Sequence, residues 1–359
     1  MTAALVAILD RRRIRRRQAV PRVIRDRNNP LDFMNDVELQ NKYRLDRDGI
    51  LYPCNKLQLD LERSTRRSGA LPLSLQVIAA LRYFATGSFQ AVTGDVHGLS
   101  RFSVSRCVHT VSRSIVNKLM KIHIKFPREN NEIRSVKRDL YNLADFPNVL
   151  GALDGTLIPI KDPSIDEHLY FSHKGYHAIN VQCVVSAKGV FLDIVAKWPC
   201  ATHDALIWRN CDLAQQFETG HIKDGWLLGE SGYSLKPWLM TPVSNPTTRQ
   251  ERAYNRSHKI TRCSCERAFG VWKSRWRCLH KSGGGMMFVP DGCVYVIVAT
   301  AVLENICKER NIPCPDNGED ECESSDEEEE DDEHDATYHQ HLRDGAITRQ
   351  QLIQIYFNN

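Results

Sequence analysis

The spacing of apolar residues divides this chain into a helical first part and a mixed second part. Between residues 71 and 120 the apolar side chains recur every three to four positions, as in amphipathic helices. The first stripe consists of Leu75, Ile78, Leu81 and Phe84, and a Gly87-Ser88 break follows it. The pattern predicts helices over residues 73–85, 89–92 and 103–116.

The third of these helices has two different faces. One face carries an apolar stripe, and the other carries Ser, Arg and His side chains that include Arg106 and Arg113. A helix, a tight turn and a helix with such an outer face are typical of a helix-turn-helix, whose last helix enters the major groove. We therefore predict that Arg106 and Arg113 contact DNA. A small helical bundle without any DNA contact would give the same pattern, so both interpretations stay open.

From Pro147 the pattern changes to short runs of β type with helical segments between them. The predicted strands cover residues 149–160, 179–187, 190–198 and 225–230. The predicted helices cover residues 205–217, 262–276 and 294–307. Strands interleaved with helices favour an α/β fold, with a mixed sheet and flanking helices.

Charge runs mark both ends of the chain. RRRIRRR at 11–17 predicts a disordered basic arm over residues 1–30, because so many like charges cannot form a core. This arm is a nuclear import signal, a phosphate-gripping tail or only a solvated one. Residues 316–335 hold 14 Asp and Glu and no Lys or Arg, which predicts a low-complexity linker. ITRQQLIQIYF at 347–357 predicts a last helix that docks on the body.

These patterns predict three further regions after the basic arm. A helical N-terminal domain covers residues 31–146, with the helix-turn-helix at about 71–120. The α/β domain covers residues 147–312, and the acidic linker and C-terminal tail cover residues 313–359. No apolar run reaches the 18 or so residues of a membrane span, so we expect no membrane partner.

The net charge of +4 is unevenly distributed along the 359 residues. Outside the acidic run the chain has all 48 Lys and Arg but only 30 of the 44 Asp and Glu, so the net charge of that part is +18. So basic a body suits a polyanion such as DNA, because each cation near a phosphate releases counterions. The alternative is a basic surface that only keeps the protein soluble.

Four acids stand at positions suited to a metal site. Asp154 ends the apolar run VLGAL at 149–153, and Glu230 ends the predicted strand over 225–230. Asp204 follows His203 where a predicted helix starts, and Glu266 lies on the helix over 262–276. Basic residues on the same side of that helix are Arg262, Lys273 and Arg277. A carboxylate among cations at the edge of a core suits a place where metal meets phosphate, and Lys273 is a predicted DNA contact.

The chemistry of phosphodiester cleavage explains why such acids would gather. Two hard cations about 3.5–4 Å apart can activate water and stabilise the leaving oxygen. Mg²⁺ and Mn²⁺ prefer oxygen ligands, so three or four carboxylates from different elements suffice. Each acid alone also has a structural explanation, since Asp204 could cap its helix and Glu266 could pair with Arg262. The metal interpretation is favoured once the resemblance below is included.

Seven segments carry a resemblance to a known family. They are ALRYFATGSFQ at 80–90, GALDGT at 151–156, HKGYHAINVQCVV at 173–185, WPCATHDALIW at 198–208, GESGYSLKPWLMTP at 229–242, CERAFGVWKSRWRCL at 265–279 and AVLENIC at 301–307. With these segments the chain resembles, from about Leu71 to Cys307, the nucleases derived from PIF/Harbinger transposases.

The resemblance implies an RNase H-like fold with a DDE triad that binds divalent metal, Mg²⁺ or Mn²⁺, as a pair of ions. By position the triad is Asp154, Glu230 and Glu266, with Asp204 as a further ligand. Lys174 then contacts phosphate or is a simple surface lysine. The resemblance also implies DNA as the substrate, a separate Myb-like DNA-binding partner, and the nucleus, with the cytoplasm as a second location; the oligomeric state stays open.

Two positions depart from the family's pattern. Position 230 is usually Asp, and position 304 is usually His, where this chain has Glu304. The longer Glu230 side chain leaves two functions open: an endonuclease, or a weakened or inactive domesticated transposase that binds DNA or acts as a scaffold. A third interpretation is an adaptor whose acidic run over 316–335 mimics DNA or folds back on the basic body.

Overall fold

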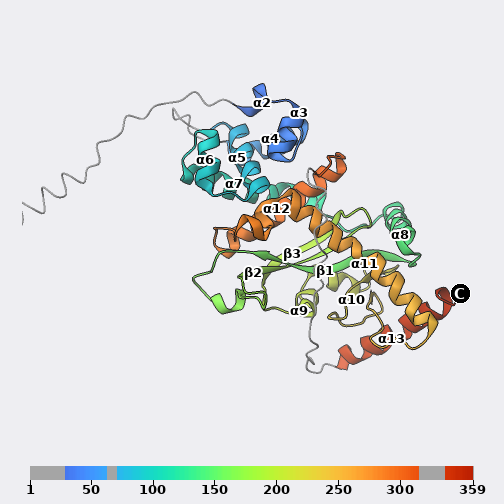
Figure 1. Ribbon diagram of the computed structural model, residues 1–359. Helices are drawn as coiled ribbons and strands as arrows, with labels where there is room; N and C mark the ends of the chain where they lie inside the picture. The colour runs from blue at the N-terminus through green and yellow to red at the C-terminus, as the bar shows by residue number, and fades with distance from the viewer. Residues whose placement is uncertain (1–28, 63–70, 315–335, 359) are drawn as a thin grey trace, which may run out of the picture.

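The structure is a computed structural model that describes residues 29–62, 71–314 and 336–358 (Figure 1). The acidic run predicted over residues 316–335 lies outside these ranges. So does the predicted basic arm over residues 1–30, apart from Asn29 and Pro30.

The described part of the chain before residue 145 forms helices only, as predicted. They are α2 (Pro30–Phe33), α3 (Asp36–Tyr43), α4 (Arg47–Leu61), α5 (Leu73–Thr86), α6 (Gln90–His97), α7 (Arg101–His123) and α8 (Asn130–Ala144). The helices predicted between 71 and 120 are confirmed as α5, α6 and α7. The break after α5 falls at Gly87, whose φ of 63° favours glycine. A Cβ there would lie 2.9 Å from the Arg277 carbonyl oxygen, so glycine also permits this close approach.

A mixed five-stranded sheet follows in the order β3-β2-β1-β4-β5. Its strands are β1 (Val149–Pro159), β2 (Ala178–Val185), β3 (Phe191–Pro199), β4 (Trp226–Leu228) and β5 (Leu239–Met240). β2 is antiparallel to β1 and β3, whereas β4 is parallel to β1 and β5. The predicted α/β class is therefore confirmed, and the architecture is that of an RNase H-like fold.

Helices cover both faces of this sheet (Figure 1). One face carries α11 (Arg249–Arg275) and α12 (Pro290–Glu309), and the other carries α9 (Asp204–Arg209) and α10 (Asp212–Glu218). Short 3₁₀ helices are η1 (Glu167–Tyr170), η2 (Arg277–Leu279) and η3 (Lys281–Gly283). Side chains alternate between the faces along each strand, so neighbouring residues of β1 serve different layers.

The helices predicted over 205–217 and 262–276 are among those whose bounds differ in the structure. The helix predicted over 205–217 is divided into α9 and α10, because the Cys211 thiol caps a new helix by accepting a hydrogen bond from the Ala214 amide at 3.3 Å. The helix predicted over 262–276 begins at Arg249, where Thr248 and Glu251 form a capping box. The buried face of its first half includes Ser257, His258 and Thr261, which form no apolar stripe.

α12 is the central helix of the core. By length and composition it could cross a membrane, but 78% of its apolar window is buried inside the protein. Asn305 ties it to β3, since its side chain accepts a hydrogen bond from the Phe191 amide and donates one to the Phe191 carbonyl. On its other side α12 packs against α7, and one continuous apolar core joins α4, α5 and α7 to this face of the sheet.

The last helix, α13 (Ala336–Tyr356), docks on the body as predicted. Its Leu352 and Ile353, with Phe357 just after it, share an apolar cluster with Phe146 and Tyr254. α13 contacts both α11 and β5. α13 therefore packs against the segment that follows Glu230 in the chain.

Candidate metal centre

Three of the four predicted acids meet on the α11 face of the sheet. Asp154 lies in β1 and is 7% exposed, and Glu230 follows the end of the neighbouring parallel strand β4. Glu266 comes from α11, which is held against β1 where the Cys265 thiol donates a hydrogen bond to the Ala152 carbonyl at 3.0 Å. One oxygen from each of the three carboxylates lies within 4.8 Å of the others.

The guanidinium of Arg262 lies between these carboxylates. Its Nη1 is 2.9 Å from Oδ2 of Asp154 and 2.8 Å from Oε1 of Glu230. Its Nη2 donates a hydrogen bond to Oε1 of Glu266 at 2.7 Å, one helical turn along α11. The i, i+4 pairing of Arg262 with Glu266 anticipated from the sequence is thus present, but it is one of three such contacts.

The three carboxylates and Arg262 shift one another's pKa values. Burial raises the pKa of Asp154 to about 8; Arg262 opposes this shift, while Glu230 and Asp204 add to it. Burial alone would lower the pKa of Arg262, but the three carboxylates outweigh burial and raise it. Arg262 therefore places one positive charge in contact with all three carboxylates.

Asp204 lies outside this three-carboxylate cluster within the described residues. Its Oδ1 accepts a hydrogen bond from Asn180 at 2.7 Å, and its Oδ2 is 3.4 Å from the Tyr233 hydroxyl. A Cβ on Gly155 would lie 2.5 Å from Oδ2 of Asp204, which explains the glycine after Asp154. Since adjacent residues of a strand point to opposite faces, Asp204 lies across the sheet from the Asp154 carboxylate.

The network that holds Asp204 was not anticipated from the sequence. Gln182 donates a hydrogen bond to the Tyr233 hydroxyl at 2.9 Å and another to the Asp204 carbonyl at 3.1 Å. The available signal is the pair Asn180 and Gln182, two polar side chains in the otherwise apolar strand β2. Buried polar groups need partners, so such residues in a covered strand indicate a network.

The predicted DNA contacts lie on three separate elements. Arg106 and Arg113 are exposed on α7, and the Arg113 guanidinium lies 5.9 Å from the centre of the Tyr295 ring of α12. Lys174 is exposed in the segment before β2. Lys273 is half-buried on α11, two helical turns after Glu266. Their contacts with DNA stay predictions.

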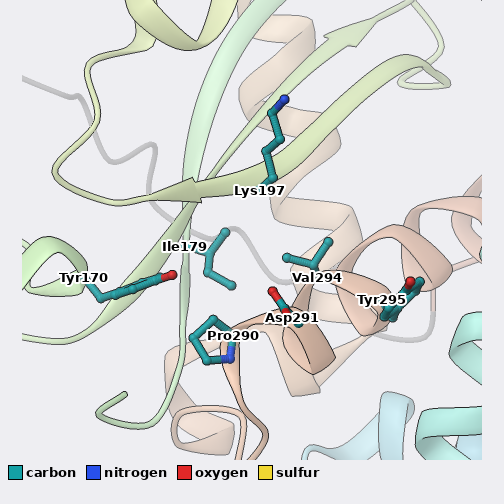
Figure 2. Close-up of a pocket in the computed structure, with 7 residues that line it drawn as sticks. All are labelled: Tyr170, Ile179, Lys197, Pro290, Asp291, Val294 and Tyr295. Atoms are coloured by element: carbon teal, nitrogen blue, oxygen red, sulfur yellow. The ribbon is translucent and has the colours of Figure 1, made fainter. Parts of the chain in front are cut away.

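A separate hollow of about 240 Å³ lies where β2 and β3 meet the start of α12 (Figure 2). Its lining consists of Tyr170, Ile179, Lys197, Pro290, Asp291, Val294 and Tyr295. Figure 2 shows the Lys197 ammonium pointing away from the other six side chains. The hollow shares no residue with the carboxylate cluster.

The donor set fits a hard divalent cation. Asp154, Glu230 and Glu266 offer oxygens only, which are the ligands that Mg²⁺ and Mn²⁺ prefer. They come from a strand, a strand end and a helix, which are rigid positions.

Comparisons with known proteins agree with this chemistry. Residues 153–305, which span all three carboxylates, match the family described as DDE superfamily endonuclease. The chain is 36% identical to "Putative nuclease HARBI1" of Homo sapiens over 79% of this chain and 80% of that protein. It is 36% identical to the protein of the same name in Rattus norvegicus, over 81% and 86%. It is 24% identical to "Protein ALP1-like" of Arabidopsis thaliana, over 84% and 75%. No solved structure matches the chain.

Proposed function

Since this chain belongs to the HARBI1 family of transposase-derived nucleases and carries a DDE superfamily endonuclease domain, we propose that it hydrolyses DNA phosphodiester bonds with bound divalent metal. The observation that carries the proposal is the convergence of Asp154, Glu230 and Glu266, with one oxygen of each within 4.8 Å of the others. In the proposal these three residues hold Mg²⁺ or Mn²⁺, as one ion or a pair.

The bound metal would activate a water molecule and stabilise the leaving oxygen. The chain's own task is to fix the ligand positions. Asp154 is fixed by the middle of β1, and Glu266 by α11, which the hydrogen bond from Cys265 to Ala152 holds against the sheet. The hydrogen bond from Asn180 holds Asp204 against β2, and a direct part in metal binding stays a proposal for Asp204.

The exposed face of α11 supports DNA as the substrate. Arg252, Arg256 and Lys259 are exposed and recur at i, i+4 and i+7, so they form one row. The row continues along the helix toward Glu266. Cations in a row beside the carboxylates would pair with successive phosphates and bring the backbone to the metal. We add Arg106, Arg113, Lys174 and Lys273 as further proposed contacts.

The test of the endonuclease proposal is nicking of a supercoiled plasmid in Mn²⁺. We expect nicking by the wild type, its loss in EDTA, and its loss in Glu266→Ala. Glu218→Ala, which removes an exposed carboxylate on α10, is the matched control and should cut like the wild type. Equal residual cutting by wild type and Glu266→Ala would reject the proposal.

A second candidate is a non-catalytic DNA-binding or scaffold protein. The observation in its favour is Arg262, which pairs with all three carboxylates. For this candidate we expect salt-sensitive DNA binding that EDTA leaves unchanged. The DNA affinity should fall when Arg106 and Arg113 are replaced. A binding titration with and without EDTA, alongside the nicking assay, separates the two candidates.

We propose the nucleus as the location, with the cytoplasm as a second one, and a Myb-like DNA-binding protein as a partner. Both proposals rest on the resemblance and on the basic run RRRIRRR. Replacing the six arginines of 11–17 by Gln in a fluorescent fusion should move the protein toward the cytoplasm. An unchanged distribution would reject this run as the import signal.

A further inference from the structure

Arg262 occupies the point on which the three carboxylates converge. Its guanidinium is largely buried, with the side chain 12% exposed, and it touches Asp154, Glu230 and Glu266 at 2.7 to 2.9 Å. The same nitrogen, Nη1, faces both Asp154 and Glu230. An ordinary i, i+4 pair on a helix surface would involve Glu266 alone.

A divalent cation would need the same oxygens. A cation held by Oδ2 of Asp154 and Oε1 of Glu230 would compete for the two oxygens that Nη1 now contacts. Two positive charges at one point repel strongly in a partly buried site. The guanidinium and the cation therefore exclude each other from this set of oxygens.

Arg262 cannot yield by losing its proton. A guanidinium stays charged at every pH at which proteins fold, so metal entry must move the side chain away from the carboxylates. While it is in place, Arg262 compensates carboxylates that would otherwise repel one another, including the buried Asp154. It therefore keeps the ligands assembled in the metal-free protein.

We propose that Arg262 is a built-in counter-ion that assembles the three carboxylates without metal and competes with the divalent cation for them, so that it sets the metal affinity of the site. The inference rests on the proposed metal-dependent function. It makes Arg262 a positioning residue, since it acts through Asp154, Glu230 and Glu266.

The test measures Mn²⁺ binding to the full chain directly, by the decrease of the free Mn²⁺ electron paramagnetic resonance signal. Arg262→Gln removes the competing charge and should tighten Mn²⁺ binding about tenfold or more relative to the wild type. Arg267→Gln removes an exposed charge beside Glu266 and should change the affinity less than twofold. Glu266→Gln should abolish binding and so assigns the signal to this site.

Thermal melting gives a second readout. In EDTA, Arg262→Gln should melt below the wild type, because its carboxylates lack a counter-ion, and Mn²⁺ should raise its melting temperature more than that of the wild type. Should Arg262→Gln fail to fold, Arg262→Lys keeps the charge but cannot reach three carboxylates as a planar fork does. Its Mn²⁺ affinity should exceed that of the wild type.

The outcomes separate this inference from the proposed function. Equal or weaker Mn²⁺ binding by both Arg262 variants, with binding by the wild type, overturns the role of Arg262 and leaves the metal site standing. Absence of Mn²⁺ binding in the wild type and in both variants overturns the metal-dependent function, and this inference with it.

Discussion

The side chain of Glu230 reaches the cluster, although the resemblance leads us to expect Asp at this position. Its Oε1 lies 2.8 Å from the nitrogen of Arg262 that also contacts Asp154. An Asp at this position would withdraw the oxygens by about one carbon–carbon bond, roughly 1.5 Å. The rest of the site is therefore built around the longer side chain.

Glu230→Asp should accordingly nick DNA more slowly than the wild type, by about ten- to a hundredfold, since a displacement of about 1 Å has effects of that size. The measurement is the initial rate of plasmid nicking at saturating Mn²⁺. Glu218→Asp, the same shortening at an exposed position, should leave the rate unchanged. A faster Glu230→Asp would show that the wild-type site is degraded.

Glu304, where the resemblance leads us to expect His, has a structural partner. Its side chain is fully buried, with Oε2 2.9 Å from Nε of Arg275 and 3.2 Å from the Trp276 indole nitrogen. Arg275 also donates hydrogen bonds to the carbonyls of Ile312 and Pro313. The acid at 304 therefore neutralises a buried arginine between α11 and α12.

Glu304→Ala should lower the free energy of unfolding by about 3–5 kcal/mol, because it leaves the Arg275 charge buried without its partner. Urea denaturation followed by tryptophan fluorescence measures this change. The control is Glu309→Ala, which removes a half-exposed carboxylate paired with His123 and should cost about 1 kcal/mol or less. Similar losses of unfolding free energy in both variants would show that the buried Glu304–Arg275 pair contributes no more to stability than the exposed pair.

Sequence reasoning at the residue scale located the acids but not their arrangement. Asp154 and Glu230 were predictable because each ends an apolar run in a turn-forming context. The central place of Arg262 was not, because it depends on the packing of α11 across β1 and β4. Asp204 was grouped with the other acids, since a sequence does not show on which side of the sheet a carboxylate lies.

At the scale of elements, α13 of the C-terminal tail packs against the segment that follows Glu230. Arg349 of α13 donates hydrogen bonds to the carbonyls of Thr241 and Pro242, just after β5. Gly345 lies against the backbone of Lys236, where a Cβ would come within 3.0 Å of the Lys236 carbonyl carbon. α13 is therefore packed as part of the body.

Leu352→Ala should destabilise the protein by about 2–4 kcal/mol, because it opens a cavity between α13 and the cluster around Phe146 and Tyr254. Chemical denaturation measures the effect. Ile355→Ala, on the same helix but 69% exposed, should stay within about 0.5 kcal/mol of the wild type. If Leu352→Ala were equally neutral, the docking of α13 would be wrong.

Element prediction succeeded where the apolar periodicity was clean. α5 and α7 carry continuous stripes, and the three long strands are apolar enough to be visible. The first half of α11 was missed because polar side chains form its buried face, and α9 and α10 were joined because a cysteine cap is not a usual helix start. β5 is two residues long and exists only through its pairing with β4.

At the scale of the whole molecule, the N-terminal helices and the sheet share one apolar core. Val108 and Ile115 of α7 belong to the same cluster as Trp272 of α11 and Ile297 of α12. Periodicity predicted the helical and α/β parts separately. It could not show that α12 packs against both, because every face of that helix is apolar.

His258 gives the fold a dependence on pH. It is fully enclosed, with Nε2 3.0 Å from the Met240 carbonyl, and burial lowers its pKa from 6.5 to about 4. Between these two values the unfolded chain binds the proton and the folded chain does not, so this contribution to stability is complete above pH 6.5 and is lost as the pH falls. Asp193 acts in the opposite direction, because burial raises its pKa to about 6.

A comparison of the wild type with His258→Gln isolates the effect of His258 on stability from that of Asp193. From pH 7 to pH 5 the unfolding free energy of the wild type should fall by about 2 kcal/mol relative to that of His258→Gln. Urea denaturation of both proteins at the two pH values measures this difference. A constant difference across that range would contradict a neutral buried imidazole.

The central claim is that Asp154, Glu230 and Glu266 together hold the metal that cuts DNA. Its most direct test is the nicking rate of a supercoiled plasmid across a Mn²⁺ titration, for the wild type and for Asp154→Asn, Glu230→Gln and Glu266→Gln. The account predicts a saturable Mn²⁺ dependence in the wild type and a loss of at least about a hundredfold in each variant. Wild-type rates in any of the three variants, or no Mn²⁺-dependent nicking by the wild type, would contradict it.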